Sequence, residues 1–299
     1  MSSKDDEEGP ASTLPRRQLG RFLRDWREKE ALTIDAAGKL ADLSRSALQR
    51  IETGRNQRIR KQDVKALCEL YGVPPEEARM AVDLSALARR KSWYHAYGGL
   101  FSDTFNMYLG LEASARRLTQ YHEQIHGLLQ TPDYARALIS AFYRGGDPDE
   151  INRRVELRMK RQAMITRKRN PLELELLLHE SALHRNIGGP RVMAAQRRHL
   201  VEVSKLPNVT VRIQPYEAGS TWGILHGPFS IMEFETNAKG KPVEPPIIYL
   251  EGGPSADVYL EKPEEVQLYS ELASDIRSSC LDEVRTRELI RRVTKEYEK

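Results

Sequence analysis

Four polar side chains stand close together in one short stretch, with apolar residues between them. On a helical wheel that turns by about 100° per residue, the four fall between about 0° and 140°. The intervening apolar residues fall near about 200°, 240° and 300°, which is one continuous sector. Arginine suits guanine, glutamine suits adenine, and serine bonds either bases or phosphate. The spacing therefore predicts a helix that packs one face and offers base-reading groups on the other, and these groups are Arg45, Ser46, Gln49 and Arg50.

The residues around this set predict two short helices joined by a tight turn. Thr33 is placed to cap the first helix and Ser44 the second, while Asp42-Leu43 makes the turn. A helix-turn-helix whose second helix enters the major groove has this form. An ordinary helical hairpin with a polar outer face is the alternative.

Basic residues surround the same stretch. Residues 16–65 hold fourteen Lys/Arg and seven Asp/Glu, whereas residues 1–15 hold one Lys and four acids. A concentration of positive charge beside the recognition helix is the electrostatic footprint expected for DNA phosphates. We expect phosphate contacts from the two capping residues and from the basic loop of residues 55–61, namely Thr33, Ser44, Arg55, Arg58, Arg60 and Lys61.

At these residues the chain resembles the phage-repressor-like (Xre) family. In that family a glutamate of the recognition helix pairs with an arginine of the preceding helices, and Glu52 and Arg27 stand at these two positions. The family usually begins the second helix with a phosphate-binding glutamine, where this chain has Ile34. The resemblance implies double-stranded DNA as the partner and a structural Arg27–Glu52 ion pair.

Patterning divides the chain into two domains. Charge and small residues predict a disordered tail over 1–14. Five helices, the first starting at Pro15, predict an all-α DNA-binding domain over 15–90. The aromatic-rich stretch of residues 91–107 is expected to be a linker.

The region 108–299 is expected to be an α+β domain with a small sheet and flanking helices. Helices are predicted over 108–119, from Pro132, over 149–168, over 191–206 and over the two final stretches 263–278 and 282–297. Short β-rich runs bounded by Gly or Pro predict strands within LELELLL, NVTVRIQPY, PFSIMEFE and PIIYLEG. The basic stretch 149–168 has two interpretations, an additional DNA contact or a solvated face or subunit contact.

Three segments of this domain extend the resemblance: GLLQTPDYARAL, YEAGSTWGILHGPFSIMEFE and IIYLEGG. They resemble the domain that follows the helix-turn-helix in a group of actinobacterial regulators that includes the Scr1-type antitoxin-like transcriptional regulators. The resemblance implies a DNA-binding regulator, often encoded beside a small partner protein.

The role of the second domain has three interpretations: dimerisation with sensing of a small effector, docking of a small partner protein, or a cryptic enzyme. A homodimer is expected, because one recognition helix reads only a few base pairs. The glycine-bounded segment Gly219–Gly227 is expected to be a flexible loop. An effector or partner site is hypothesised from six aromatic and polar residues, Tyr121, Gln130, Tyr134, Trp222, His226 and Tyr249.

Other features argue against an enzyme, a cofactor and a membrane protein. His179 and His184 are five residues apart, whereas a zinc-protease helix needs a spacing of four, so no metal site is expected. Neither a phosphate-cradling loop nor a nucleophile elbow is present, and no catalytic residue or cofactor is predicted. The two cysteines, the acidic start and the absence of an apolar run of about 18 residues lead us to expect a cytoplasmic protein with reduced thiols.

Overall fold

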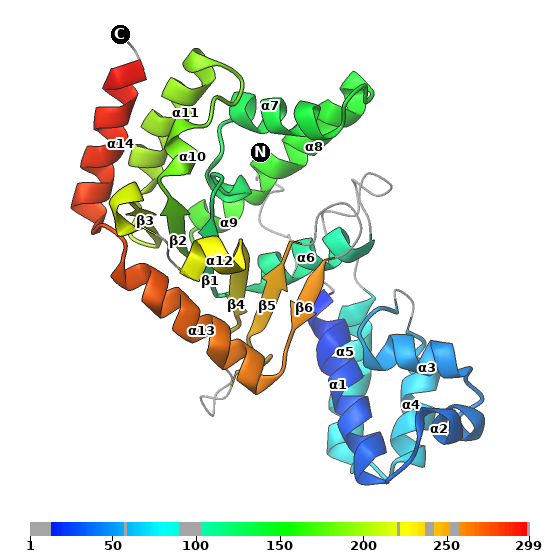
Figure 1. Cartoon of the computed structure of the whole chain (residues 1–299). Coiled ribbons are helices and arrows are strands. Elements are labelled where there is room, and N and C mark those ends of the chain that lie inside the picture. The colour runs from blue at the N-terminus through cyan, green and yellow to red at the C-terminus, as the bar shows by residue number, and fades with distance from the viewer. Residues whose placement is uncertain are drawn as a thin grey trace. The chain divides into compact units, whose positions relative to one another are not determined.

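The computed structural model describes residues 13–56, 59–89, 103–219, 222–236, 242–251 and 257–297. The chain forms two compact units (Figure 1). The first comprises residues up to 96 together with Asn106–Ser114, and the second comprises Tyr97–Phe105 and Ala115–Lys299. The expected boundary at residue 108 therefore differs from the division into compact units, because residues 106–114 group with the first unit. Most of the expected tail and linker lies outside the described residues.

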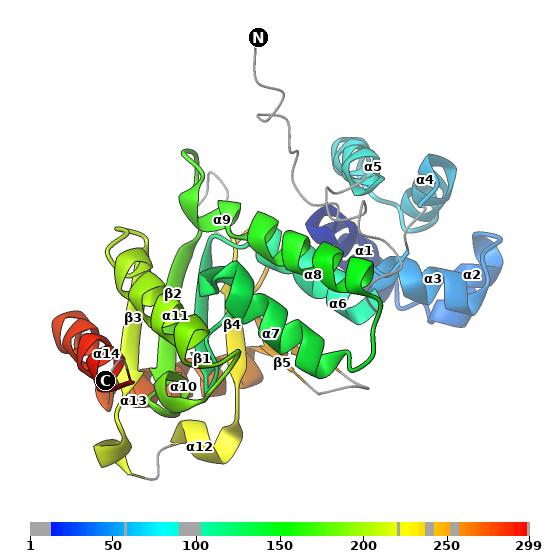
Figure 2. The ribbon, with the colours of Figure 1, turned by 90° about the horizontal axis from the view of Figure 1, so that it is seen from above.

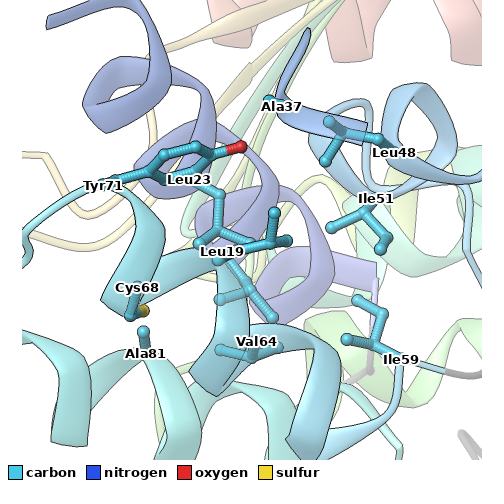
Figure 3. Close-up of a cluster of buried hydrophobic side chains, with 11 residues drawn as sticks. Leu19, Leu23, Ala37, Leu48, Ile51, Ile59, Val64, Cys68, Tyr71 and Ala81 are labelled. Carbon is cyan, nitrogen blue, oxygen red and sulfur yellow. The ribbon is translucent and has the colours of Figure 1, made fainter. Parts of the chain in front are cut away.

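Five helices make up most of the first unit, as expected. They are α1 (Thr13–Lys29), α2 (Ile34–Leu40), α3 (Arg45–Glu52), α4 (Lys61–Leu70) and α5 (Pro75–Ala88). Helix α1 begins two residues before the Pro15 predicted as its start. The helices pack their apolar faces around one buried cluster, shown in Figure 3, that includes Leu19, Leu23, Leu48, Ile51 and Val64.

The turn between α2 and α3 depends on backbone geometry at two positions. Asp42 has a φ of 55°, and the Leu43 amide donates to the Gly38 carbonyl at 2.8 Å. A Cβ at Gly38 would lie 2.7 Å from the Leu43 carbonyl oxygen, so a larger residue would prevent this close return of the chain. Thr33 and Ser44 cap the two helices by accepting from the amides of Ala36 and Ala47, as predicted.

The second unit contains one six-stranded mixed sheet with the order β3-β2-β1-β4-β5-β6. Its strands are β1 (Arg117–His122), β2 (Glu173–His179), β3 (Val209–Gln214), β4 (Phe229–Glu233), β5 (Ile247–Leu250) and β6 (Val258–Leu260). The first three strands are parallel, and the last three join them as an antiparallel meander. This arrangement brings the carboxyl ends of β1, β2 and β3 to one edge of the sheet.

Helices cover both faces of this sheet (Figures 1 and 2). One face carries α7 (Pro132–Phe142), α8 (Pro148–Arg161), α9 (Ala163–Thr166), α10 (Ser181–His184) and α11 (Pro190–Val203). The other carries α13 (Pro263–Ser278), whose Leu272, Ala273 and Ile276 pack on the strands. Helix α14 (Glu283–Tyr297) lies beside α11 and β3, where Thr286 accepts a hydrogen bond from the Ile213 amide. No helix among the described residues has the length and apolar character needed to cross a bilayer.

The prediction of a helix over 108–119 is wrong in its second half. Helix α6 (Asp103–Ser114) ends before Ala115, and the next residues form the central strand β1. The sequence RLTQYH is too polar to indicate a buried strand by itself. Its polar side chains can be buried because they form hydrogen bonds with residues of neighbouring strands. Thr119 bonds Glu175 of β2, and Gln120 bonds Ser230 of β4.

Two further predictions change. The basic helix expected over 149–168 is two helices, because α8 ends at Arg161 and the short α9 ends at Thr166. Within the expected flexible loop Gly219–Gly227, residues Trp222–His226 form the short helix α12. A side chain at Gly223 would collide with the ring of Tyr121, so α12 is packed against the sheet rather than displayed as an open loop.

Candidate nucleic-acid interface

Helix α3 has the two faces that its sequence predicts. Leu48 and Ile51 are buried, whereas the base-reading candidates Arg45, Ser46, Gln49 and Arg50 are all exposed. The structure therefore brings these four side chains onto one accessible helix surface. Polar groups on a capped helix of this kind can reach base edges in a major groove.

Asp35 contacts one of the base-reading candidates, and the sequence pattern did not predict this contact. Its carboxylate lies 2.9 Å from the Arg45 guanidinium, and the two side chains are 53% and 68% exposed. An exposed pair of this kind stabilises a protein by less than about 1 kcal/mol, so Arg45 can exchange Asp35 for a base or a phosphate. The signal in the sequence was an acid in the first turn of α2, which the turn folds back towards the start of α3.

Arg27 and Glu52 form the predicted ion pair between α1 and the end of α3. Nε and Nη2 of Arg27 donate to the two carboxylate oxygens at 2.7 and 2.9 Å, and Nη1 donates to the Leu32 carbonyl at 2.7 Å. The hydrogen bond to Glu52 raises the pKa of Arg27, against the opposing effect of burial. The pair thus fixes the recognition helix against α1 without using any of its exposed side chains.

Gly20 allows α1 to approach the end of α3 at backbone distance. A Cβ at this position would clash with the Ile51 carbonyl oxygen and would lie 2.7 Å from that of Glu52. The sequence showed only a glycine inside a helical pattern. Its role becomes visible once the packing partner of α1 is known.

Two of the residues predicted to contact DNA phosphates also stabilise the fold. Thr33 and Ser44 are exposed and act as helix caps. Three basic side chains, Arg55, Arg60 and Lys61, are exposed beside α3 and α4. Arg58 lies outside the described residues.

Two of the six residues proposed for an effector or partner site lie on opposite faces of the sheet. Tyr249 pairs with Ser230, which pairs with Gln120, so these three side chains share one face of the sheet. Tyr121 is the next residue after Gln120 and points to the opposite face, where it packs with Phe229. Alternation along β1 therefore separates two members of the proposed set.

The other members have separate surroundings. Gln130 is buried, donating to the Ile125 carbonyl at 2.6 Å and accepting from Arg158 at 2.9 Å, so it holds the segment after β1 together. Tyr134 is fully buried in α7, and His226 is exposed on α12. The Tyr249 hydroxyl donates to Asp257 at 3.0 Å. The side chain of Trp222 lies outside what the structure describes.

Several arginines of the basic helix α8 contact other residues of the second unit. Arg154 is buried, bonds the Tyr143 hydroxyl at 2.9 Å and stacks on that ring. Arg161 is buried over the ring of Phe105, and Arg158 donates to Gln130. These arginines therefore contribute to packing, which favours the structural interpretation of this stretch over an additional DNA contact.

The two histidines of the zinc alternative have different partners. Nδ1 of His179 lies 2.8 Å from the Ser181 hydroxyl, and His184 lies 3.5 Å from Glu180 and beside Tyr297. Within the described ranges, no group of three His, Cys, Asp or Glu side chains is arranged to hold a metal ion.

Comparison with known proteins identifies both regions. A family model described as a helix-turn-helix domain matches residues 18–80. A second model, described as a domain of unknown function (DUF5753), matches residues 105–292. No curated protein and no solved structure matches the chain. The helix-turn-helix match agrees with the geometry of α2 and α3 and indicates a DNA-binding regulator.

Proposed function

We infer the function of this chain from the premise that it belongs to the DUF5753 family and carries a helix-turn-helix domain ahead of the family's own domain. It is a sequence-specific, DNA-binding transcriptional regulator. One observation carries this proposal: α3 buries Leu48 and Ile51 and exposes four side chains of base-reading type. The basic residues beside the helix supply phosphate contacts.

The finer assignment is to the Xre family and its actinobacterial Scr1-type, antitoxin-like group. The doubly hydrogen-bonded Arg27–Glu52 pair supports the Xre assignment, since that family pairs these positions. The segment GLLQTPDYARAL supports the group, and its residues have a structural role that explains such a motif. Thr131 caps α7, and Gln196 of α11 bonds both the Thr131 amide and the Leu129 carbonyl.

The regulator acts as a homodimer in the cytoplasm, where bacterial DNA lies. Two recognition helices one helical turn of DNA apart would read two half-sites, which gives more specificity than one helix can. The large second unit supplies the dimer contact and senses a small effector. An effector can regulate only if it binds the DNA-competent and DNA-incompetent states with different affinity.

A small partner protein is the alternative regulator of the second unit. Helix α12 favours this alternative, because its Ile224 and Leu225 are large exposed apolar side chains held next to each other. We assign no enzymatic activity, since the sequence contains neither a phosphate-cradling loop nor a nucleophile elbow.

DNA selection with the full chain tests the proposal. Random duplexes are enriched on the protein over several rounds, and a two-fold-related sequence motif is expected. Enrichment without any common sequence would contradict sequence-specific recognition.

Native mass spectrometry of the protein purified from its own host tests the second unit. A dimer carrying a small added mass supports sensing, and a complex with a small protein supports the alternative. A monomer would contradict the homodimer, and an apo dimer without added mass would contradict both regulatory roles.

A further inference from the structure

The carboxyl end of β1 contains buried polar atoms that the fold leaves without partners. Gln120 is completely buried at the centre of the sheet, opposite Ser230 of β4. One end of its amide lies 2.9 Å from the Ser230 hydroxyl and 3.2 Å from Nε2 of His126. The other end has no hydrogen-bond partner among the described residues. A buried amide group without a partner is costly, so an unpaired one calls for an explanation.

The protonation of His126 identifies the unpaired end of the amide. Nδ1 of His126 accepts from the Leu128 amide at 3.4 Å. Burial, followed by the charges around it, lowers the pKa of His126 well below its usual value, so the neutral ring carries its hydrogen on Nε2. The end of the Gln120 amide that lies 3.2 Å from this nitrogen accepts that hydrogen if it is the oxygen, and the same oxygen then accepts from the Ser230 hydroxyl. The Gln120 NH₂ group is then the unpaired end, with two N–H donors.

His122 adds a second unpaired atom to the same face. It lies two residues after Gln120, so the two side chains project from the same side of β1. Nε2 of His122 is buried and has no partner in the described chain, and its ring centroid lies 5.5 Å from that of His126. Burial lowers the pKa of His122 to about 4, so the ring is neutral at physiological pH and can donate through Nε2 in the tautomer that carries its hydrogen there.

The surrounding charges are mixed. Arg158 and Arg161 of α8 are close enough to depress the pKa of His126, and the stem of Arg158 packs at 3.7 Å from the position of a Cβ on Gly127. Glu251 and Asp257 lie beyond the end of β5 and oppose an accumulation of negative charge. These surroundings suit a small molecule with one oxygen acceptor better than a polyanion such as a nucleotide.

The position in the fold agrees with a ligand site. Open sheets with parallel strands bind ligands beyond the carboxyl ends of those strands, on the loops that follow them. His122 is the last residue of β1, and His126 belongs to the loop that leads into α7.

We propose that the carboxyl end of β1, on the face covered by α7 and α8, binds a small molecule through a carbonyl-type oxygen that accepts from Gln120 and His122. The oxygen belongs to a carboxylate or to an amide, and Arg158 and Arg161 favour the carboxylate. This site would be the effector site of the proposed regulator, and only its regulatory meaning rests on that proposed function.

The test uses the full chain labelled with ¹⁵N-histidine and titrated with acetate, acetamide or methylammonium. The ring resonances of His122 and His126 are assigned with His122→Phe and His126→Asn. Acetate is expected to shift the His122 signals and to saturate in the millimolar range, acetamide to do so more weakly, and methylammonium to have no effect. Before any addition, the spectrum should show His126 protonated on Nε2.

Two variants report on the donors, and one serves as a control. Gln120→Glu should abolish the acetate response, because a carboxylate replaces the donor. His122→Phe should weaken the saturation measured at His126 by at least tenfold. Gln124→Leu changes an exposed glutamine on the same loop and should respond like the wild type.

The proposal is overturned if neither oxygen-bearing probe shifts these rings, if methylammonium shifts them equally, or if Gln120→Glu responds like the wild type. A stronger response to acetamide than to acetate would overturn the preference for a carboxylate. All of these measurements are made without DNA. A chain that binds acetate here but no DNA refutes the proposed function alone, and the opposite result refutes the site alone.

Discussion

Arg27 of α1 holds both carboxylate oxygens of Glu52, the last residue of the recognition helix, and only 8% and 3% of the two side chains are exposed. Removing one partner of a buried pair leaves the other charge without compensation. Glu52→Ala should therefore destabilise the helix-turn-helix unit by about 3–5 kcal/mol. This change is measured by urea unfolding of the full chain, in which hydrogen exchange of the amides in residues 13–89 reports on the first unit.

The exposed Asp35–Arg45 pair provides the matched control for this measurement. Asp35→Ala breaks an ion pair of similar length at the surface and should cost less than about 1 kcal/mol. Equal costs for the two variants would contradict a buried, bracing role for Arg27 and Glu52.

The close packing of α1 against α3 at Gly20 can be tested by asking whether Gly20→Ala raises or lowers the stability of the protein. In an open helix, Gly→Ala stabilises a protein by roughly 0.5–1 kcal/mol. Here the added Cβ meets the carbonyl oxygens of Ile51 and Glu52, so Gly20→Ala should destabilise by about 1–3 kcal/mol. A melting temperature above that of the wild type would show that α1 and α3 are less tightly packed than described.

Glu175 links stability to pH in the second unit. Burial alone would raise the pKa of Glu175, but the hydrogen bonds and charges of Arg277 and Arg117 outweigh it and lower this pKa. A depressed pKa in the folded state gives stability above the unfolded pKa of about 4.3, and this stability is lost as the pH falls through the folded value. Glu175→Gln should cost about 1.5–3 kcal/mol at pH 7.

The difference between Glu175→Gln and the wild type should shrink below about pH 4, as denaturant unfolding across a pH series would show. Glu173→Gln is the control, because Glu173 pairs with Arg116 at the exposed surface. A Glu175→Gln deficit that stays constant down to about pH 2 would mean that the charge of Glu175 is not the source of the stability.

Arg60 tests the division between phosphate and base contacts. It is exposed at the cap of α4, and phosphate contacts do not depend on sequence. Arg60→Ala should weaken binding to all duplexes by the same factor and reduce the slope of log K against log salt by about 0.9. Fluorescence anisotropy at several salt concentrations measures both quantities, and a loss confined to one sequence would assign Arg60 to base reading.

Local signals were enough to predict the helix-turn-helix. Thr33 and Ser44 are caps with a recognisable sequence signature, and the apolar spacing of Leu48 and Ile51 defines the buried face of α3. The Arg27–Glu52 pair was accessible only through the family resemblance, because two charged residues so far apart in sequence carry no local signal.

The second unit shows where local signals fail. The first half of strand β1 lies within the helix predicted over 108–119, and the partners that hold the polar Thr119 and Gln120 in the sheet, Glu175 and Ser230, lie on other strands. The separation of Tyr121 from Tyr249 has a related cause, because the face of the sheet that each side chain occupies depends on strand register. The helices over 263–278 and 282–297 were predicted to within a residue, since their amphipathic spacing is local.

A double substitution on α3 tests whether the exposed face of this helix reads DNA sequence. The full chain and its Gln49→Ala/Arg50→Ala variant are titrated with the selected operator duplex and with a scrambled duplex, at several salt concentrations. Each lost bidentate base contact should cost about 1–3 kcal/mol on the operator only. The operator-to-scrambled affinity ratio of the variant should fall close to one, while salt-sensitive binding to both duplexes remains. An unchanged ratio in the variant would contradict the assignment of α3 as the recognition helix.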